Sequence, residues 1–447
     1  MKNNIAKADI LRQAFQDDIR YVRLQFTDLH GTLKNVEIPV NQLAEALDGK
    51  IMFDGSSIHG FVRIEESDMY LQPDLSTWLM LPFSPDGIKI ARLICNISLP
   101  DGTPFSADPR GILQRVIHEA KELGFDEYRI GVELEFFLLK LDDRKKPTVQ
   151  PNDQGGYFDI APTDAGENCR RDIVLTLQQL GIAVASSHHE TAPGQHEIDL
   201  HAADALTVAD HITTLKMVAR TISRIHGLHA TFMPKPLQDE DGSGLHCHLS
   251  LGRSKENAFY HVGDQYHLSP VARSFIAGLL FHAPAITAIT NPLVNSYKRL
   301  IPGYEAPAYT FWSTSHRMPF VRVPSATDTP TDTQIELRSP DASCNPYLAF
   351  AAILKAGLDG VSNRMCPPDP IHHSLVTMSE DERFQYQITP LPTSLEQAIE
   401  ALEENEIIQD ALGMHAFSHY LQAKLWEWEQ YRKTVHPWEL DHYLERY

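Results

Sequence analysis

Four short segments of this chain alternate charged and apolar side chains in the same way. They span residues 131–138, 195–200, 244–251 and 334–338. Because successive side chains on a strand point to opposite faces, each segment predicts a strand with one apolar face and one polar face. A single such strand would indicate only an antiparallel sheet with a wet side. Four of them, rich in carboxylates and imidazoles, favour one shared cavity lined by charge.

The polar faces of these strands offer ligands for metal ions. They carry Glu133 and Glu135, then Glu197 and Asp199, then His246, His248 and Ser250, and finally Glu336 and Arg338. Carboxylates gathered in one cavity repel one another unless cations offset their charge. Glutamate oxygens with a single imidazole suit Mg²⁺ or Mn²⁺ better than zinc or copper. Two such ions would support phosphoryl transfer.

Three other features point toward the same cavity. Glu190 precedes a proline-glycine turn at 193–194, which would aim its carboxylate at the site. Residues 291–307 have turn residues at both ends, so this loop is predicted to act as a lid. Candidates to hold carboxylate or phosphate oxygens are Arg299, Arg317, Arg322 and Arg338, although an arginine taken alone more often forms a surface ion pair. The residues alone therefore indicate a two-metal transferase or ligase and leave its substrates open.

Length and charge narrow the class of protein further. A chain of 447 residues is too long for most single cores, so two or three domains are expected, with a boundary near residues 100–108. The formal net charge of −20 argues against nucleic acid and anionic membranes as partners. Five cysteines without a C-x-x-C pair fit a reducing compartment. Residues 1–18 lack the apolar core of a signal peptide, and His282 and Pro284 interrupt the most apolar stretch, so a soluble cytoplasmic protein is expected.

Several long motifs, in the right order along essentially the whole chain, resemble the signature segments of bacterial type I glutamine synthetases, most of all the shorter subtype of Gram-positive bacteria. They are residues 52–58, 133–135, 188–200, 235–251, 291–307 and 335–349. The resemblance implies an α+β fold, with a β-grasp domain over residues 1–105. It implies a catalytic domain over 106–447, in which helices flank a curved antiparallel sheet and a helical tail ends the chain. It also implies a dodecamer of two stacked hexameric rings, with active sites between neighbouring subunits.

The same resemblance implies roles for individual residues. One metal ion would be bound by Glu135, Glu190 and Glu197, and the other by Glu133, His246 and Glu336. Glutamate or its γ-phosphate would contact Asp241, Gly242, Arg299, Glu305, Arg317 and Arg338. ATP would lie near His248, Ser250, Arg317 and Arg322. The catalytic residues would be Asp54, which takes the proton from ammonium in the neighbouring site, with Glu305 and Arg338. Arg63 would be linked to feedback inhibition by glutamine.

The activity implied by the resemblance is ATP-dependent ligation of ammonia to L-glutamate through γ-glutamyl phosphate, with two Mg²⁺ or Mn²⁺ ions per site, as part of nitrogen assimilation. Two alternatives share the fold. A ligase that joins glutamate to a polyamine is disfavoured by the retained segment 54–57, and a non-catalytic regulatory homologue is disfavoured by the full set of six metal ligands. Nitrogen-responsive transcription regulators are further expected partners by resemblance.

The sequence departs from the family pattern at a few positions. Asp241 stands where the family usually has asparagine, and Ala185 stands where close relatives carry an acid near ATP. Residues 325–334 lack their usual basic side chains, and no adenylylation motif lies between residues 372 and 392. The C-terminal tail is unusually aromatic, so it is predicted to dock on its own core or on a neighbouring subunit. Its aromatic residues are Trp426, Trp428, Tyr431, Trp438 and Tyr447.

Overall fold

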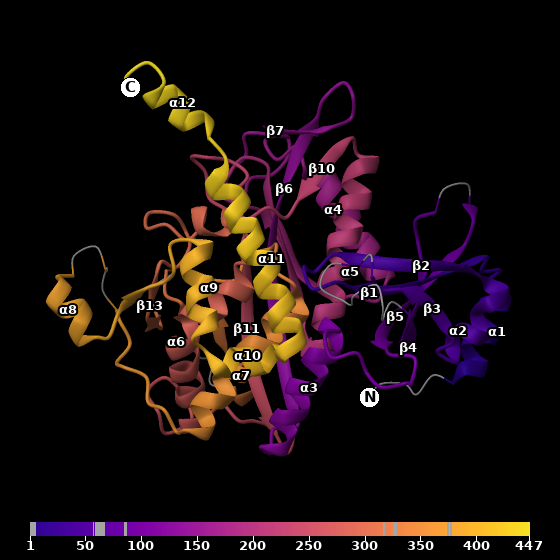
Figure 1. Cartoon of the computed structure of the whole chain (residues 1–447), viewed down its shortest axis with the longest axis horizontal. Helices are drawn as coiled ribbons and strands as arrows, with labels where there is room; N and C mark the ends of the chain where they lie inside the picture. Colours follow the sequence, from indigo (N-terminus) through magenta and orange to yellow (C-terminus); the bar gives the residue numbers. More distant parts are fainter. Residues whose placement is uncertain are drawn as a thin grey trace.

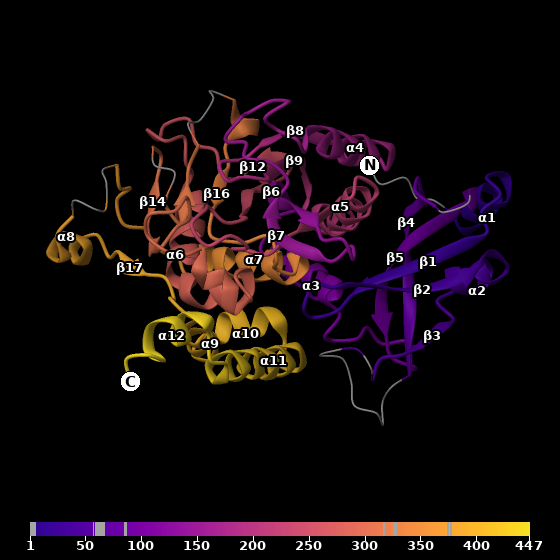
Figure 2. The same cartoon turned by 90° about the horizontal axis from the view of Figure 1, so that it is seen from above.

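The computed structural model describes residues 6–56, 58, 68–84, 87–315, 318–324, 329–372, 375 and 378–447. A smaller N-terminal body, drawn in indigo and purple, lies beside a larger body that holds the rest of the chain (Figure 1 and Figure 2). Two predicted site residues, Arg63 and Arg317, lie outside the described residues, as do four residues of the 325–334 stretch.

A five-stranded sheet in the order β2-β1-β5-β4-β3 forms the smaller body. Strands β1 and β5 run parallel at its centre, and the other neighbours are antiparallel. Helix α2 packs against β4 and against α1. This confirms the predicted β-grasp domain. Its elements are α1 (Lys7–Gln16), β1 (Tyr21–Thr27), β2 (Leu33–Pro39), α2 (Leu43–Leu47), β3 (Ile51–Asp54), β4 (Asp68–Leu81) and β5 (Ile90–Ser98).

A ten-stranded sheet organises the larger body, with the path β14-β15-β16-β11-β6-β9-β8; β7 and β10 pair with β6, and β12 with β11. The four predicted strands are β16, β11, β6 and β9, and they are consecutive neighbours in this sheet. The strands are β6 (Glu127–Leu141), β7 (Pro147–Pro151), β8 (Val184–His189), β9 (Gln195–Asp204), β10 (Leu228–Thr231), β11 (Leu245–Arg253), β12 (Glu256–Asn257), β14 (Trp312–Ser313), β15 (Val321–Arg322) and β16 (Ile335–Leu337). A separate pair joins β13 (Tyr309–Thr310) to β17 (Thr389–Pro390).

The strand register gathers the polar side chains on one face of this sheet. Residues directly opposite each other in antiparallel neighbours have side chains on the same side. The opposed pairs are His246 with Glu133, Glu197 with Glu135, and Glu336 with His248. The predicted gathering of carboxylates and imidazoles is therefore confirmed.

The other face of the sheet is apolar and is covered by helices. Leu134, Phe136 and Cys247 on this face are fully buried. Helix α5 packs against β6 and β9, and α7 packs against α3, α5 and α6. The helices of this body are α3 (Pro109–Glu122), α4 (Glu167–Gln179), α5 (Ala205–Ile225), α6 (Pro270–Thr290), α7 (Pro346–Ser362), α8 (Glu380–Gln385), α9 (Leu395–Glu403), α10 (Glu406–Leu412), α11 (Met414–Lys433) and α12 (Pro437–Tyr443).

Two helices show what local sequence contributes. Helix α3 begins at a local cap, because the Asp108 side chain accepts a hydrogen bond from the Arg110 N–H and Pro109 occupies the first turn. Helix α6 contains Pro284 and is the one described helix long and apolar enough to span a membrane by those measures. Most of its apolar stretch is buried inside the body, as expected for a core helix.

The C-terminal helices leave part of the aromatic tail uncovered. Helix α11 packs against α9 and α10, and Trp428 lies partly buried against the core. In contrast, α12 has no buried residue and projects away from the body (Figure 1). Trp438, on α12, is 57% exposed.

The predicted boundary at residues 105 and 106 falls between the end of β5 and the start of α3, and this division stays a prediction.

Candidate active site

A cavity of about 600 Å³ opens on the polar face of the large sheet. Its lining includes five of the six predicted metal ligands and five further predicted site residues. The predicted residues in the lining are Glu133, Glu135, Glu190, Glu197, His246, Asp241, Gly242, Glu305, Arg322 and Arg338. The sixth predicted ligand, Glu336, is fully buried against this group. The chain thus brings together, in one place, side chains from β6, β9, β11, β16 and the loops between them.

Glu133, His246 and Glu336 form one cluster at this cavity. Each offers a ligand atom, and these atoms lie within 4.8 Å of one another. The Nδ1 atom of His246 is 2.9 Å from Glu133 Oε2 and 3.9 Å from Glu336 Oε1. The other carboxylate oxygen of Glu133 is 2.8 Å from His248 Nε2. Burial works to raise the pKa of Glu133, but the hydrogen bonds with the two imidazoles hold it well below its usual range.

Glu135 and Glu197 form a second cluster, which shares His246 with the first. Glu190 lies at its edge, since His188 Nε2 is 2.8 Å from Glu190 Oε1 and 3.5 Å from Glu197 Oε1. Burial, followed by the charge of Glu135, raises the pKa of Glu197 to about 12. Burial also raises the pKa of Glu135, and the charge of Glu190 adds to the effect. These carboxylates cannot all be ionised unless positive charge enters the cavity.

The donor set fits divalent cations. His246 Nε2 is buried without a hydrogen-bond partner among the described residues, and it lies 3.9 Å from Glu135 Oε1. Gly244 keeps the space between these ligands open, because an added Cβ would meet His246 Nε2 at 3.1 Å and Glu135 Oε1 at 3.2 Å. Carboxylate oxygens around one imidazole match the preferences of Mg²⁺ and Mn²⁺. Both clusters therefore present ligands that a hard cation would accept.

Two arginines hold the buried Glu336 carboxylate from opposite sides. Arg322 Nη1 donates to Glu336 Oε2 at 2.9 Å, and Arg338 Nη1 donates to Glu336 Oε1. Although burial opposes it, the charge of Arg338 lowers the pKa of Glu336. Both arginines line the cavity, so their remaining N–H groups are placed to meet phosphate or carboxylate oxygens.

Arg299, His248 and Ser250 do not line the cavity. Arg299 is only 2% exposed and donates to the main-chain oxygens of Ser339 at 2.8 Å and Pro340 at 3.3 Å. Its guanidinium lies directly behind Gly244, where an added Cβ would be 2.5 Å from Nη2. His248 and Ser250 continue the polar row along β11 beyond the cavity. Their predicted contacts with glutamate or ATP stay predictions.

Asp54 lies in the small domain, away from the cavity of its own chain. No described residue before Glu133 lines that cavity. The Asp54 carboxylate is exposed and accepts hydrogen bonds from the Ser56 hydroxyl at 2.6 Å and the Ser56 N–H at 2.8 Å. These two bonds lower its pKa, so the carboxylate is poised as an anion.

An aromatic pair at the cavity rim was not found by sequence reasoning. Tyr157 and Phe158 are 46% and 60% exposed and both line the cavity. The Phe158 ring lies 4.7 Å from the His188 ring, which in turn contacts Glu190. The segment that carries them, Gly155-Gly156-Tyr157-Phe158, reads as a loop, and local pattern does not reveal that it reaches the sheet.

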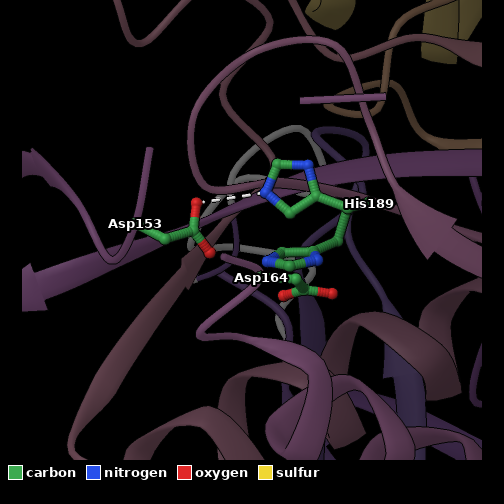
Figure 3. Close-up of side chains that lie close together, drawn as sticks. Asp153, Asp164 and His189 are labelled. Carbon is green, nitrogen blue, oxygen red and sulfur yellow. Dashed lines mark hydrogen bonds and ion pairs between the residues drawn. The ribbon is translucent and has the colours of Figure 1, made fainter. Parts of the chain in front are cut away.

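A buried polar cluster behind Glu190 and Glu197 was also missed. Figure 3 shows the Asp153 carboxylate bonded to the His189 ring, with Asp164 nearby. His189 Nε2 is 3.1 Å from Asp153 Oδ1, and its Nδ1 is 2.7 Å from the Glu190 carbonyl oxygen. Since a carbonyl oxygen and a carboxylate both accept hydrogen bonds, this geometry favours an imidazole protonated on both nitrogens. Burial alone would lower the pKa of His189, but the hydrogen bond to Asp153 raises it.

The same cluster includes His196, which precedes Glu197 on β9. Arg170 Nη1 lies 2.7 Å from both Asp164 Oδ2 and His196 Nδ1. A guanidinium therefore already occupies the position that a metal ion would need, so the cluster is not read as a metal site. Instead, the cluster holds His189 and His196, which directly precede Glu190 and Glu197, as supporting hydrogen bonds do around metal ligands.

Fold and cavity together define a class: an enzyme whose acid-lined sheet offers ligands for divalent cations beside two arginines. Family models described as the glutamine synthetase β-grasp domain and the glutamine synthetase catalytic domain match residues 18–100 and 106–443. A glutamine synthetase of Staphylococcus aureus is 53% identical over 446 residues, covering 100% of both chains. One of Staphylococcus epidermidis is 52% identical with the same coverage.

Solved structures agree with these matches. A Plasmodium falciparum glutamine synthetase superposes with a TM-score of 0.88 at 28% identity, covering 98% of this chain and 99% of the other. A GmaS complex with ADP has the same TM-score at 31% identity and the same coverage. The chain belongs to the glutamine synthetase family. This confirms the predicted family, the α+β fold class and the prediction of a ligase.

Proposed function

We propose that this chain joins ammonia to L-glutamate at the expense of ATP, giving L-glutamine, ADP and phosphate, at the cavity on the polar face of its large sheet. The observation that carries the proposal is the double cluster of carboxylates around His246. Full-length relatives named glutamine synthetase, at 52–53% identity, support the same reaction. Its physiological place is nitrogen assimilation in the cytoplasm. A ligase for larger amines, or a non-catalytic homologue, is not favoured by these relatives.

The chemistry proceeds in two transfers. The γ-carboxylate of glutamate attacks the γ-phosphorus of ATP, so that γ-glutamyl phosphate forms and ADP leaves. Ammonia then attacks the acyl carbon, and phosphate leaves. Two Mg²⁺ or Mn²⁺ ions, one at each carboxylate cluster, would offset the charge on the phosphoryl group. Glu133, His246 and Glu336 would hold one ion, and Glu135, Glu190 and Glu197 the other.

Arginine side chains and the predicted lid, residues 291–307, complete the site in this proposal. Arg322 and Arg338 already face the cavity beside Glu336, so they would hold phosphoryl and carboxylate oxygens. Asp241, Gly242 and Glu305 also line the cavity and would contact glutamate, with Arg299 and Arg317 as further expected ligands. ATP would lie toward His248, Ser250 and Arg322. Glu305 would shield the acyl phosphate from water.

Asp54 would act in the site of a neighbouring subunit. Its distance from its own chain's cavity supports this, since the small domain contributes no described residue to the lining. Its anionic carboxylate would take a proton from ammonium and release ammonia. The uncovered helix α12 supports contact with another subunit. We therefore expect head-to-tail hexameric rings, stacked as a dodecamer.

Regulation follows the family expectation. Arg63, which lies outside the described residues, would mediate feedback inhibition by glutamine. Its replacement in Arg63→Ala is expected to keep most activity and to weaken inhibition by glutamine, measured as an inhibition curve. An unchanged curve would favour an arginine that only pairs with Glu65 or Glu66. Nitrogen-responsive transcription regulators are proposed as further partners.

The direct test is glutamine formation from glutamate and ammonium, with and without ATP and Mg²⁺. We expect product only when all are present, and little product when putrescine replaces ammonium. The variant Glu336→Ala should be inactive while it keeps the oligomer seen by size-exclusion chromatography. Full activity of this variant at saturating Mg²⁺ would contradict the assignment of the metal cluster.

A further inference from the structure

Lys235 is buried in an unusual environment under the predicted lid, residues 291–307. Lys235 is only 7% exposed, and its Nζ atom has no hydrogen-bond partner in the part of the chain that the structure describes. Burial lowers its pKa, opposed by the charges of Asp241 and its neighbours, yet Nζ has no hydrogen bond to any described carboxylate. A buried ammonium without hydrogen bonds is costly, so another interaction must stabilise it.

The ring of Tyr304, in the lid, supplies that interaction. Lys235 Nζ lies 3.9 Å from the centroid of the Tyr304 ring. At this distance the negative face of the aromatic ring attracts the cation, and the attraction is stronger where water is excluded. Because Tyr304 directly precedes Glu305, this contact fixes the part of the lid that carries the Glu305 side chain.

Two further contacts join the Lys235 segment to the same lid. At the start of the lid, Asn295 binds the Lys235 backbone twice, accepting from its N–H at 2.8 Å and donating to its carbonyl oxygen at 3.1 Å. Near the end of the lid, the Glu305 N–H donates to Asp241 Oδ1 at 3.1 Å. The Ser243 N–H donates to the Pro234 carbonyl at 2.8 Å, which closes the short loop between these contacts.

The closed loop also reaches the carboxylate clusters. The Gly244 N–H donates to Glu135 Oε2 at 2.9 Å. The Gln195 amide is shared between Glu135 Oε2, at 2.9 Å, and the Gly242 carbonyl, at 3.2 Å. A displacement of this loop would therefore disturb the hydrogen bonds of both the lid and Glu135.

We propose that Lys235 is a positioning residue that latches the lid over the active site through the ring of Tyr304. The latch places Glu305 at the rim of the cavity and keeps a positive charge near Asp241, at the position where the family usually has asparagine. Its functional consequence rests on the proposed glutamine-forming activity. With the latch broken, water reaches the acyl phosphate, and the acyl–oxygen bond is hydrolysed to glutamate and phosphate in place of glutamine.

Hydrogen exchange of the full-length protein tests the latch without reference to activity. We expect the amides of residues 303–306 to exchange about five to thirty times faster in Lys235→Met and in Tyr304→Leu than in the wild type. Tyr304→Phe, which keeps the ring, and Lys235→Arg, which keeps a cation, should retain most of the protection. Lys298→Met is a matched control, because its ammonium lies 5.6 Å from the Tyr431 ring at the base of the same lid.

The double variant decides between a latch and a merely buried lysine. If the ammonium and the ring act through each other, Lys235→Met combined with Tyr304→Leu should exchange no faster than either single variant. Tyr304 is a loop residue outside the core, so Tyr304→Leu remains informative even if Lys235→Met fails to fold. The proposal would be overturned if the lid amides of Lys235→Met and Tyr304→Leu exchanged no faster than those of Lys298→Met. It would also be overturned if the exchange rate of the double variant rose by the product of the two single effects.

A kinetic measurement tests the consequence. The ratio of ATP hydrolysed to glutamine formed should be close to one in the wild type and should rise in both latch variants, with recovery in Tyr304→Phe. A ratio that stays at one while the lid exchanges faster would overturn the shielding role. If the wild type makes no glutamine at all, the proposed function fails, whereas the exchange measurements still decide whether the latch exists.

Discussion

Metal binding at the paired carboxylates should release protons. Burial and the charge of Glu135 raise the pKa of Glu197 to about 12 from its ordinary 4.5. The Glu197 carboxyl therefore holds its proton much more strongly than an ordinary glutamate does before an ion enters. A divalent cation needs the ionised form, so binding must expel this proton. We therefore expect about one proton released from Glu197 for each ion bound at this cluster.

The magnitude follows from linkage. Each proton released makes the association constant rise about tenfold per pH unit, which equals about 1.4 kcal/mol. Without the ion, the folded chain binds a proton at Glu197 that the unfolded chain, with its ordinary pKa, has already lost. The free energy of unfolding should therefore fall as the pH rises above about 5, by up to about 1.4 kcal/mol per pH unit for this group. Added Mn²⁺ should flatten that dependence.

Titration calorimetry with Mn²⁺ in two buffers of different ionisation enthalpy measures the proton count. At pH 8 we expect Mn²⁺ binding to release one or more protons per site in the wild type. Glu197→Gln should release about one proton fewer, because its amide carries no acidic proton. Glu122→Gln, on the exposed end of α3, should leave the count unchanged. A Mn²⁺ affinity that does not vary between pH 6.5 and 8, with no proton released, would refute the reasoning.

Three further outcomes are expected. Gly244→Ala should weaken Mn²⁺ binding and activity at least tenfold, because the added methyl group would lie 2.5 Å from Arg299 Nη2. Gly131→Ala is the control and should change neither, because its methyl group would meet Ala202 at 3.4 Å. Equal losses in the two variants would contradict the packing argument. Co-assembled Asp54→Ala and Glu336→Ala subunits should regain about a quarter of the sites, whereas persistent inactivity would place Asp54 in its own chain's site. Asp153→Asn should weaken Mn²⁺ binding about tenfold or more by loosening His189, measured by calorimetry, and unchanged affinity would show that the buried cluster does not position the ligands.

Local sequence patterns predicted the strands of the site and the faces of their side chains. Alternation in β6, β9, β11 and β16 is a property of each segment, so it can be recognised without knowing the fold. The start of α3 at Asp108 was likewise predictable, because a helix cap is made by residues next to each other in sequence. The family, and with it the β-grasp domain, followed from motifs spread along the whole chain.

Only the tertiary structure decided which strands are neighbours and how they are aligned. The pairing of His246 with Glu133, across more than a hundred residues, sets the first cluster, and no local period contains that register. Asp153, which pairs with the His189 ring, and the aromatic pair at the rim belong to a loop whose sequence carries no strand or helix pattern. Arg299 shows the same limit, since its sequence suggested an exposed ligand and the fold buried it against main-chain carbonyls. Side-chain alternation fixes the face that a residue presents, whereas its partners depend on chain segments far apart in sequence, whose approach is decided by packing of the whole core.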